Sequence, residues 1–211
     1  MFIHVTLFLI LMLIKTPIVC AVLIDFEDVP QPPGVFIPAS SVDSGGFNFS
    51  DPFGFHLGLE NNFDGAFNGT TILFVEAKVT MRRIDGSSFS LLSFDFGEDF
   101  GTPGIFDEYA KDLTVTGALV GGGTVVAHFT LDGLFDGSGG IADFQSGTLI
   151  GFTHLASVAF SGSGGSFGST FALDNLSVSA VPVPEPSSLM LLALGTPGLA
   201  VKAWRRRRSI C

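Results

Sequence analysis

The sequence predicts an all-β domain, an antiparallel two-sheet sandwich of jelly-roll character, flanked by two apolar ends. No helical hydrophobic period of useful length occurs between residues 22 and 181. Short stretches of β-branched and aromatic residues recur there instead, closed by Gly, Asp and Asn. No fixed-period repeat is visible, which argues against a solenoid. A chain of 211 residues has room for one such domain.

Nine strands are expected, in the order in which these stretches occur. They are Val22–Phe26, Phe53–Leu59, Thr71–Met81, Phe89–Phe96, Leu113–Val120, Thr124–Leu131, Thr148–Phe152, Leu155–Phe160 and Phe171–Ser179. Apolar and polar residues alternate between Val75 and Ile84, as in a strand with one face in water. The Asp85-Gly86 pair predicts a hairpin into the next strand, and Gly121–Gly123 predicts another.

Phenylalanine is expected to fill the core of this domain. Residues 22–181 contain 21 Phe, whose rings bury large areas. The alternative is a sticky, Phe-rich binding surface, but the phenylalanines alternate with polar residues or glycine, which favours packing within a sheet. The same segment has 19 acidic and only four basic residues, so it lacks the basic face that nucleic acid requires.

The N-terminus predicts export. Val5–Ile14 is an unbroken apolar run, suited to a signal peptide and too short to span a bilayer. We expect residues 1–21 to be the signal peptide, with cleavage between Ala21 and Val22. A lipoprotein acylated at Cys20 is the alternative.

The C-terminus, residues 182–211, combines three features. Pro184, Glu185 and Pro186 precede an apolar segment at residues 189–203, which is followed by Arg205, Arg206, Arg207 and Arg208. Fifteen helical residues reach about 22 Å, less than a hydrocarbon core of about 30 Å, so the transmembrane helix would be a weak anchor. The arginines are expected to stay on the cytoplasmic side, which leaves residues 22–181 outside.

This tail resembles the PEP-CTERM sorting tail of Gram-negative bacteria. In that family an exosortase, a membrane transpeptidase-like enzyme, recognises the tail near its Pro-Glu-Pro triplet. The resemblance implies export machinery and an exosortase-type enzyme as partners, and a transient inner-membrane anchor. The expected final location is the cell surface or the extracellular matrix. A permanent anchor that is never cleaved is the alternative.

Few motifs predict chemistry in the passenger, residues 22–181. It has no cysteine and no H-E-x-x-H motif, so zinc chemistry has no support. Gly164–Gly168 fits G-x-S-x-G, but it lies in a Gly/Ser run without the strand and helix that a nucleophile elbow requires.

Two sets of acidic residues are candidates for structural calcium. The first set belongs to a cluster of acidic residues within eighteen positions, mostly in a Gly/Pro loop between strands: Asp95, Glu98, Asp99, Asp107, Glu108 and Asp112. Of these, Asp95, Glu98 and Asp99 are the candidate ligands, since calcium takes hard oxygen ligands on a flexible loop, although solvated surface charge is the alternative. The second set is Asp25 and Glu27 at the start of the passenger and Asp174 near its end. It resembles the first and last strands of calcium-stapled, galactose-binding-like jelly rolls, such as many carbohydrate-binding modules. That resemblance implies one calcium shared between the first and last strands.

The function predicted from the sequence is that of an exported, non-catalytic protein of the cell surface or extracellular matrix. Its role would be structural, adhesive or weakly glycan-binding, with extracellular polysaccharide as a partner. One alternative is a secreted glycan hydrolase or lyase that uses two carboxylates such as Asp95 and Asp107. Another is an ice- or surface-binding protein, which requires rows of threonine, whereas the threonines look scattered along the sequence.

Overall fold

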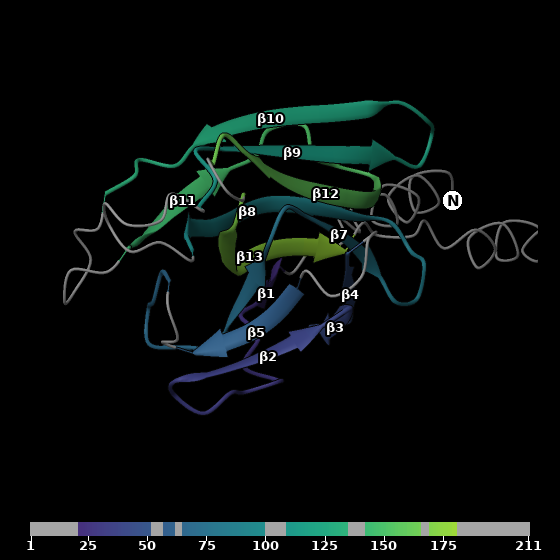
Figure 1. Cartoon of the computed structure of the whole chain (residues 1–211). Coiled ribbons are helices and arrows are strands. Elements are labelled where there is room, and N and C mark those ends of the chain that lie inside the picture. Colours follow the sequence, from purple (N-terminus) through teal and green to yellow (C-terminus); the bar gives the residue numbers. More distant parts are fainter. Residues whose placement is uncertain are drawn as a thin grey trace, which may run out of the picture. The chain divides into compact units, whose positions relative to one another are not determined.

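The computed structural model describes residues 21–51, 57–61, 65–99, 109–134, 142–165 and 169–180. Within these ranges the chain forms thirteen strands, all paired antiparallel, and no helix. Figure 1 shows how these strands are arranged. The all-β prediction is therefore confirmed. The predicted signal peptide (apart from Ala21) and the predicted tail lie outside the described residues. The described part contains no helix that is long and apolar enough to cross a membrane.

The chain divides into two compact units, Met1–Val181 and Pro182–Cys211. The described strands all belong to the first unit, where they form two layers. The first layer runs in the order β2 (Val35–Ala39), β5 (Leu57–Asn61), β6 (Ile72–Val75), β13 (Phe171–Ala180) and β8 (Phe89–Glu98). It is extended by β1 (Ala21–Ile24), which pairs with β13, and by β11 (Phe144–Thr148), which pairs with β8.

The second layer runs in the order β3 (Ser41–Ser44), β4 (Phe47–Ser50), β7 (Lys78–Arg83), β12 (Leu155–Ser163), β9 (Asp112–Leu119) and β10 (Thr124–Thr130). A single residue pair, Leu155 and Phe89, joins β12 to β8 and connects the two layers. At the other side β3 contacts β5, so the strands nearly close into a barrel. In Figure 1 β9, β10 and β12 lie above β13, β5 and β2.

Phenylalanines fill the space between the layers. The ring of Phe94 is fully buried and lies 5.2–5.4 Å, centroid to centroid, from the rings of Phe96, Phe129 and Phe160. The pairs of Phe94 with Phe129 and with Phe160 are edge-to-face, and such pairs add to the stability that area burial provides. Phe26, Phe49, Phe89, Phe152 and Phe171 are also buried. The interpretation of phenylalanine as core volume is confirmed for the described residues.

Two predicted strand assignments need correction, and three strands were not predicted. Thr71–Met81 is not one strand but two, β6 and β7, because the chain crosses between the layers at the exposed residues Glu76 and Ala77. The strand expected at Thr148–Phe152 is β11, which ends at Thr148 before the chain bends at Ile150. Strands β2, β3 and β4 were not predicted.

The two turn predictions have different outcomes. Gly121–Gly123 joins β9 to β10, which pair directly, so this hairpin is confirmed. Asp85-Gly86 also turns the chain, with Gly86 at a φ of 71° and its N–H donating to the Arg83 carbonyl over 3.1 Å. However, β7 and β8 do not pair with each other, because β12 lies between them. The predicted hairpin is wrong.

Candidate functional site

Asp174 is buried on the outer side of the first layer. Its neighbour Leu173 belongs to the main core, whereas Ala172 packs in a second, smaller apolar cluster with Ala66, Ile72 and Ala142. Because side chains alternate along a strand, Asp174 shares the outer side with Ala172. The covering segment, residues 65–71, lies over this side and leaves Asp174 with 0% exposure.

The carboxylate of Asp174 accepts hydrogen bonds on both oxygens. Asn68 Nδ2 donates to Oδ2 over 2.6 Å, and Thr70 Oγ1 lies 3.1 Å from the same oxygen. The backbone N–H of Asn175 donates to Oδ1 over 2.8 Å. Asn175 has a positive φ of 50°, and the pairing of β13 with β8 shifts register between Asp174 and Ser177. This bulge turns the Asn175 N–H toward the carboxylate.

Burial raises the pKa of Asp174 from 3.8 to about 6. Removal from water disfavours the charged form, and this is the largest cause. The hydrogen bonds from Asn68, Asn175 and Thr70 oppose the shift, whereas the nearby negative charge of Asp25 adds to it. The Asp174 carboxylate is therefore surrounded by uncharged hydrogen-bond donors and lies near a second negative charge, that of Asp25.

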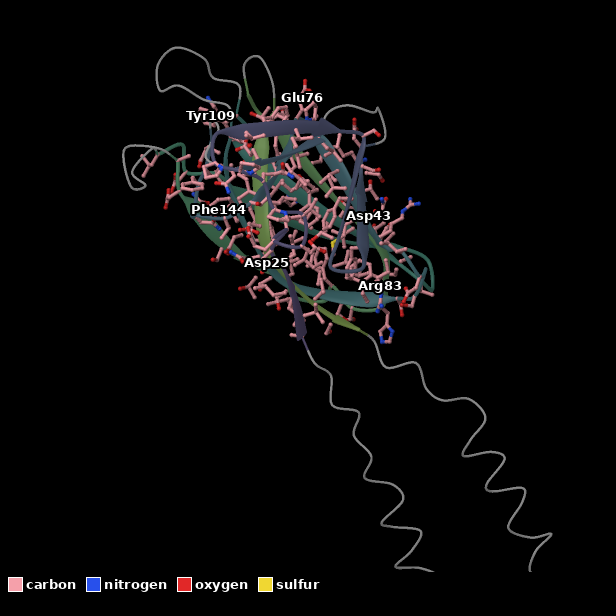
Figure 2. The ribbon with its side chains drawn as sticks, turned by 90° about the horizontal axis from the view of Figure 1, so that it is seen from below. Asp25, Asp43, Glu76, Arg83, Tyr109 and Phe144 are labelled. Atoms are coloured by element: carbon pink, nitrogen blue, oxygen red, sulfur yellow. The ribbon has the colours of Figure 1, made fainter. Side chains whose placement is uncertain are left out.

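The structure brings the first strand to this site, as the sequence predicts. Strand β1 pairs with β13 up to Ile24 and Leu176, so Asp25 follows directly beside the Asp174 bulge. Glu27 Oε1 accepts a hydrogen bond from the N–H of Thr71, at the end of the covering segment, over 2.6 Å. In Figure 2 Phe144 is at the left of the domain, Asp43 and Arg83 are at the right, and Asp25 lies between them.

Asp95 belongs to the same site and not to the group with Glu98 and Asp99. It lies directly opposite Asp174 in the pairing of β8 with β13. Its oxygens accept hydrogen bonds from Ser146 Oγ over 2.6 Å and from Asn175 Nδ2 over 3.0 Å. The expected grouping of Asp95 with Glu98 needs correction, because residues three apart in a strand point to opposite sides.

Glu98 points to the other side of β8, at its end. It follows the alternation of Phe94 and Phe96, which are core residues, and has 1% exposure. Its Oε1 accepts a hydrogen bond from the N–H of Gly133 over 2.7 Å. Its Oε2 is buried and has no hydrogen-bond partner. Burial raises the pKa of Glu98, and the charges of Asp132 and Asp143 add to this.

Asp99 occupies a third position, on the outer side, and has 0% exposure. It bridges to Gly65, and a Cβ at Gly65 would lie only 1.9 Å from Asp99 Oδ1. A side chain at position 65 would therefore force the buried Asp99 side chain to move. Asp95, Glu98 and Asp99 therefore lie in three different environments and do not form one group.

No three Asp, Glu, His or Cys side chains among the described residues are arranged to hold a metal ion. Around Asp174, hydrogen-bond donors already contact both carboxylate oxygens, so Asp25, Glu27 and Asp174 do not fit a calcium ion as they stand. The calcium prediction for this set stays a prediction. Asp107, the second carboxylate of the hydrolase alternative, lies outside the described residues.

Several residues that complete these surroundings were not among the site residues predicted from the sequence. Asn68, Thr70 and Asn175 surround Asp174, and the negative charges of Asp132 and Asp143 help to raise the pKa of Glu98. The local signals are present: Asn68-Gly69 and Asp132-Gly133 are turn sequences. Their partners, however, are supplied by strands far away in the chain.

Comparison with known proteins gives structural and sequence similarities. The passenger is similar to the K2 cleaved adhesin domain of Lys-gingipain, with a TM-score of 0.45 and 11% identity over 77% of this chain and 99% of that one. It is also similar to the family 29 carbohydrate-binding module CBM29-2, with a TM-score of 0.41 and 12% identity over 76% of this chain and 92% of that one. The curated protein sequences contain no match. Residues 182–208 match the PEP-CTERM protein-sorting motif. The chain therefore carries, at its C-terminus, the sorting signal of an exported protein.

Proposed function

We propose that this chain is an exported, non-catalytic component of the cell surface or extracellular matrix, with a structural or adhesive role. The observation that carries the proposal is the sorting motif at residues 182–208. A sorting tail of this kind implies processing by exosortase-type machinery, and the folded passenger would be the part that is delivered. The strongly acidic composition of the passenger supports a role that does not involve nucleic acid.

The outer side of the second layer supports an adhesive role. Small side chains form a row across six strands, and cross-strand pairing aligns them: Val126, Thr116, Ala159, Thr80, Ser50 and Ser41. A neighbouring row contains His128, Thr114, Ser161 and Lys78. Hydroxyl groups both donate and accept hydrogen bonds, and no large aromatic residue stands in either row. Such a side suits a weak, extended contact with a polysaccharide.

The same rows favour a second candidate, an ice- or surface-binding protein. Thr80, Thr114 and Thr116 look scattered in the sequence, but strand pairing places them in two adjacent rows. The two candidates differ in their partner. Co-sedimentation with the producing organism's extracellular polysaccharide supports adhesion, whereas inhibition of ice recrystallisation without that co-sedimentation supports the second candidate. Thr116→Glu is expected to weaken whichever contact exists, with the exposed Asp85→Asn as the matched control.

Intact-protein mass spectrometry of surface material tests the sorting proposal. We expect a chain that begins near Val22 and ends near Pro184–Pro186. Finding residues 187–211 in the mature pool would show that the tail remains as an anchor. Replacing Arg205–Arg208 by glutamine should misorient the anchor and reduce the amount at the surface, because these charges determine orientation.

A test for catalysis separates this proposal from the hydrolase alternative. Asp95 already accepts hydrogen bonds from Ser146 and Asn175, so it supports the Asp174 bulge. We expect no release of reducing ends from the producing organism's polysaccharide. Turnover that disappears in Asp95→Asn would overturn the proposal in favour of the enzyme.

A further inference from the structure

Strand β10 forms one edge of the second layer. Among the described strands it pairs with β9 alone, and in Figure 1 it is the outermost strand of its layer. Its pairing with β9 runs through all seven residues, Thr124–Thr130, without a bulge. A regular strand at the edge of a sheet presents a row of backbone N–H and C=O groups that can pair with another strand.

The hydrogen bonds at the two ends of the hairpin show which backbone groups face this edge. The Leu131 N–H donates to the Lys111 carbonyl over 2.9 Å, and the Leu119 N–H donates to the Gly123 carbonyl over 3.1 Å. Both pairs continue the register of β9 with β10, so the odd-numbered residues of β10 exchange hydrogen bonds with β9. The even-numbered residues therefore direct their N–H and C=O groups away from β9: Thr124, Val126, His128 and Thr130.

Strand β10 lacks the features that commonly protect an edge. It contains no proline and no Asp, Glu, Lys or Arg. Four other described strands pair on one side only, and each has four or five residues: β1, β2, β3 and β11. Of these, β2 contains Pro38 and β3 contains Asp43. The longest edge strand among the described residues is therefore also uncharged and free of proline.

We propose that β10 pairs with β10 of a second copy of this chain, antiparallel about a two-fold axis, so that the two second layers join into one sheet. Charge favours this edge as the place where two copies meet. The passenger has 19 acidic and only four basic residues, so two copies repel each other in general. Pairing through β10 places no carboxylate in the line of contact.

The sequence of β10 complements itself when Ala127 lies on the axis. Thr124 is then opposite Thr130 of the partner subunit. Val126 is opposite His128 of the partner subunit, on the exposed side of the sheet. Every backbone group that points away from β9 then meets a partner, because these are hydrogen-bonded pairs that exchange two bonds each. The joined sheet would present the small-residue rows of both copies on one side, yet the pairing itself does not rest on the adhesive role.

Cross-linking that depends on register tests the pairing in the full chain, with the two cysteines of the sequence, Cys20 and Cys211, replaced by serine. Ala127→Cys places two thiols at the axis, where paired Cα atoms are about 4.5 Å apart and can form a disulfide. Val125→Cys is the matched control, because it lies on the same side of the same strand. Its two copies would be about 13 Å apart along the strands, too far for a disulfide. We expect oxidised dimers of Ala127→Cys and none of Val125→Cys.

Val126→Pro tests the backbone pairing without a cysteine. The Val126 N–H points away from β9, so proline removes no hydrogen bond between these strands but blocks the edge. In sedimentation equilibrium of the full chain in detergent, Val126→Pro should weaken dimerisation at least about tenfold, because two hydrogen bonds are lost about the axis. Val126→Thr keeps the N–H and should dimerise as the wild type does.

Three results would overturn the proposal. They are a wild-type chain that stays monomeric, equal cross-linking of Ala127→Cys and Val125→Cys, and dimerisation that Val126→Pro leaves unchanged. If Val126→Pro fails to fold, the comparison of the two cysteine variants decides the question by itself.

Discussion

Replacing Asp174 by asparagine should remove a pH dependence from the stability of the passenger. The carboxylate has 0% exposure, and burial together with the charge of Asp25 raises its pKa to about 6 from 3.8. Asparagine has nearly the same shape and stays neutral at every pH. It therefore removes the titration of this side chain while it keeps the volume.

The expected magnitude follows from the size of the pKa shift. A change from 3.8 to about 6 is about two units, and each unit corresponds to about 1.4 kcal/mol, so the contribution is about 3 kcal/mol. Between these pH values the folded chain binds more protons at Asp174 than the unfolded chain does. The free energy of unfolding therefore falls as the pH rises from about 4 to about 6. Above that window the full cost of the buried charge is present.

Urea unfolding at a series of pH values from about 3.5 to 7 measures this effect, with a chelator present throughout. The quantity of interest is the difference between the wild-type and Asp174→Asn curves, since Glu98 also has a raised pKa and contributes in the same direction to both. The control is Asp85→Asn, because hydrogen bonds from Ser87 lower the pKa of the exposed Asp85. Parallel wild-type and Asp174→Asn curves across this range would refute the reasoning.

Three further predictions concern packing and the covering segment. In urea unfolding, Gly97→Ala should lower the free energy of unfolding by about 1–3 kcal/mol, because the new Cβ would lie 2.7 Å from the Asp143 carbonyl oxygen. The control is Gly121→Ala, which should change this free energy very little because a Cβ there meets no atom within 4 Å. Glu27→Ala removes the acceptor of the Thr71 N–H and should lower the free energy of unfolding by about 1 kcal/mol. Faster hydrogen exchange of the Thr71 amide would show that the loss of this hydrogen bond is the cause. Phe94→Ala should cost about 3–5 kcal/mol in thermal or urea unfolding, and a loss below 1 kcal/mol would contradict its place in the core.

Local patterns in the sequence predicted those parts of the fold that local physics determines. Gly121–Gly123 connects strands that pair with each other, and the alternation at residues 78–82 matches β7, where Val79 and Met81 are buried. The Asp85-Gly86 turn was equally clear locally. It did not give a hairpin because β12, which comes much later in the chain, occupies the place between β7 and β8.

The candidate site was predictable in one respect only. Acidic residues in the first and last strands were expected to meet, and β1 does bring Asp25 beside Asp174. The donors on Asp174 come from the covering segment, and strand pairing places Asp95 opposite Asp174. Both depend on contacts between segments that are distant in sequence. The charges that act on Glu98 likewise come from distant segments: Asp132 follows β10, and Asp143 precedes β11.

The position of β13 links folding to sorting. This last strand of the passenger pairs with β1, β6 and β8, so it lies inside the first layer and not at an edge. It carries Asp174 and directly precedes the residues that lead to the sorting motif. Because contacts between distant segments form only when both are available, the first layer cannot be completed without residues 171–180. The fold of the passenger therefore depends on its last strand, and pairing of Val22 with Val178 places the two ends of the passenger side by side.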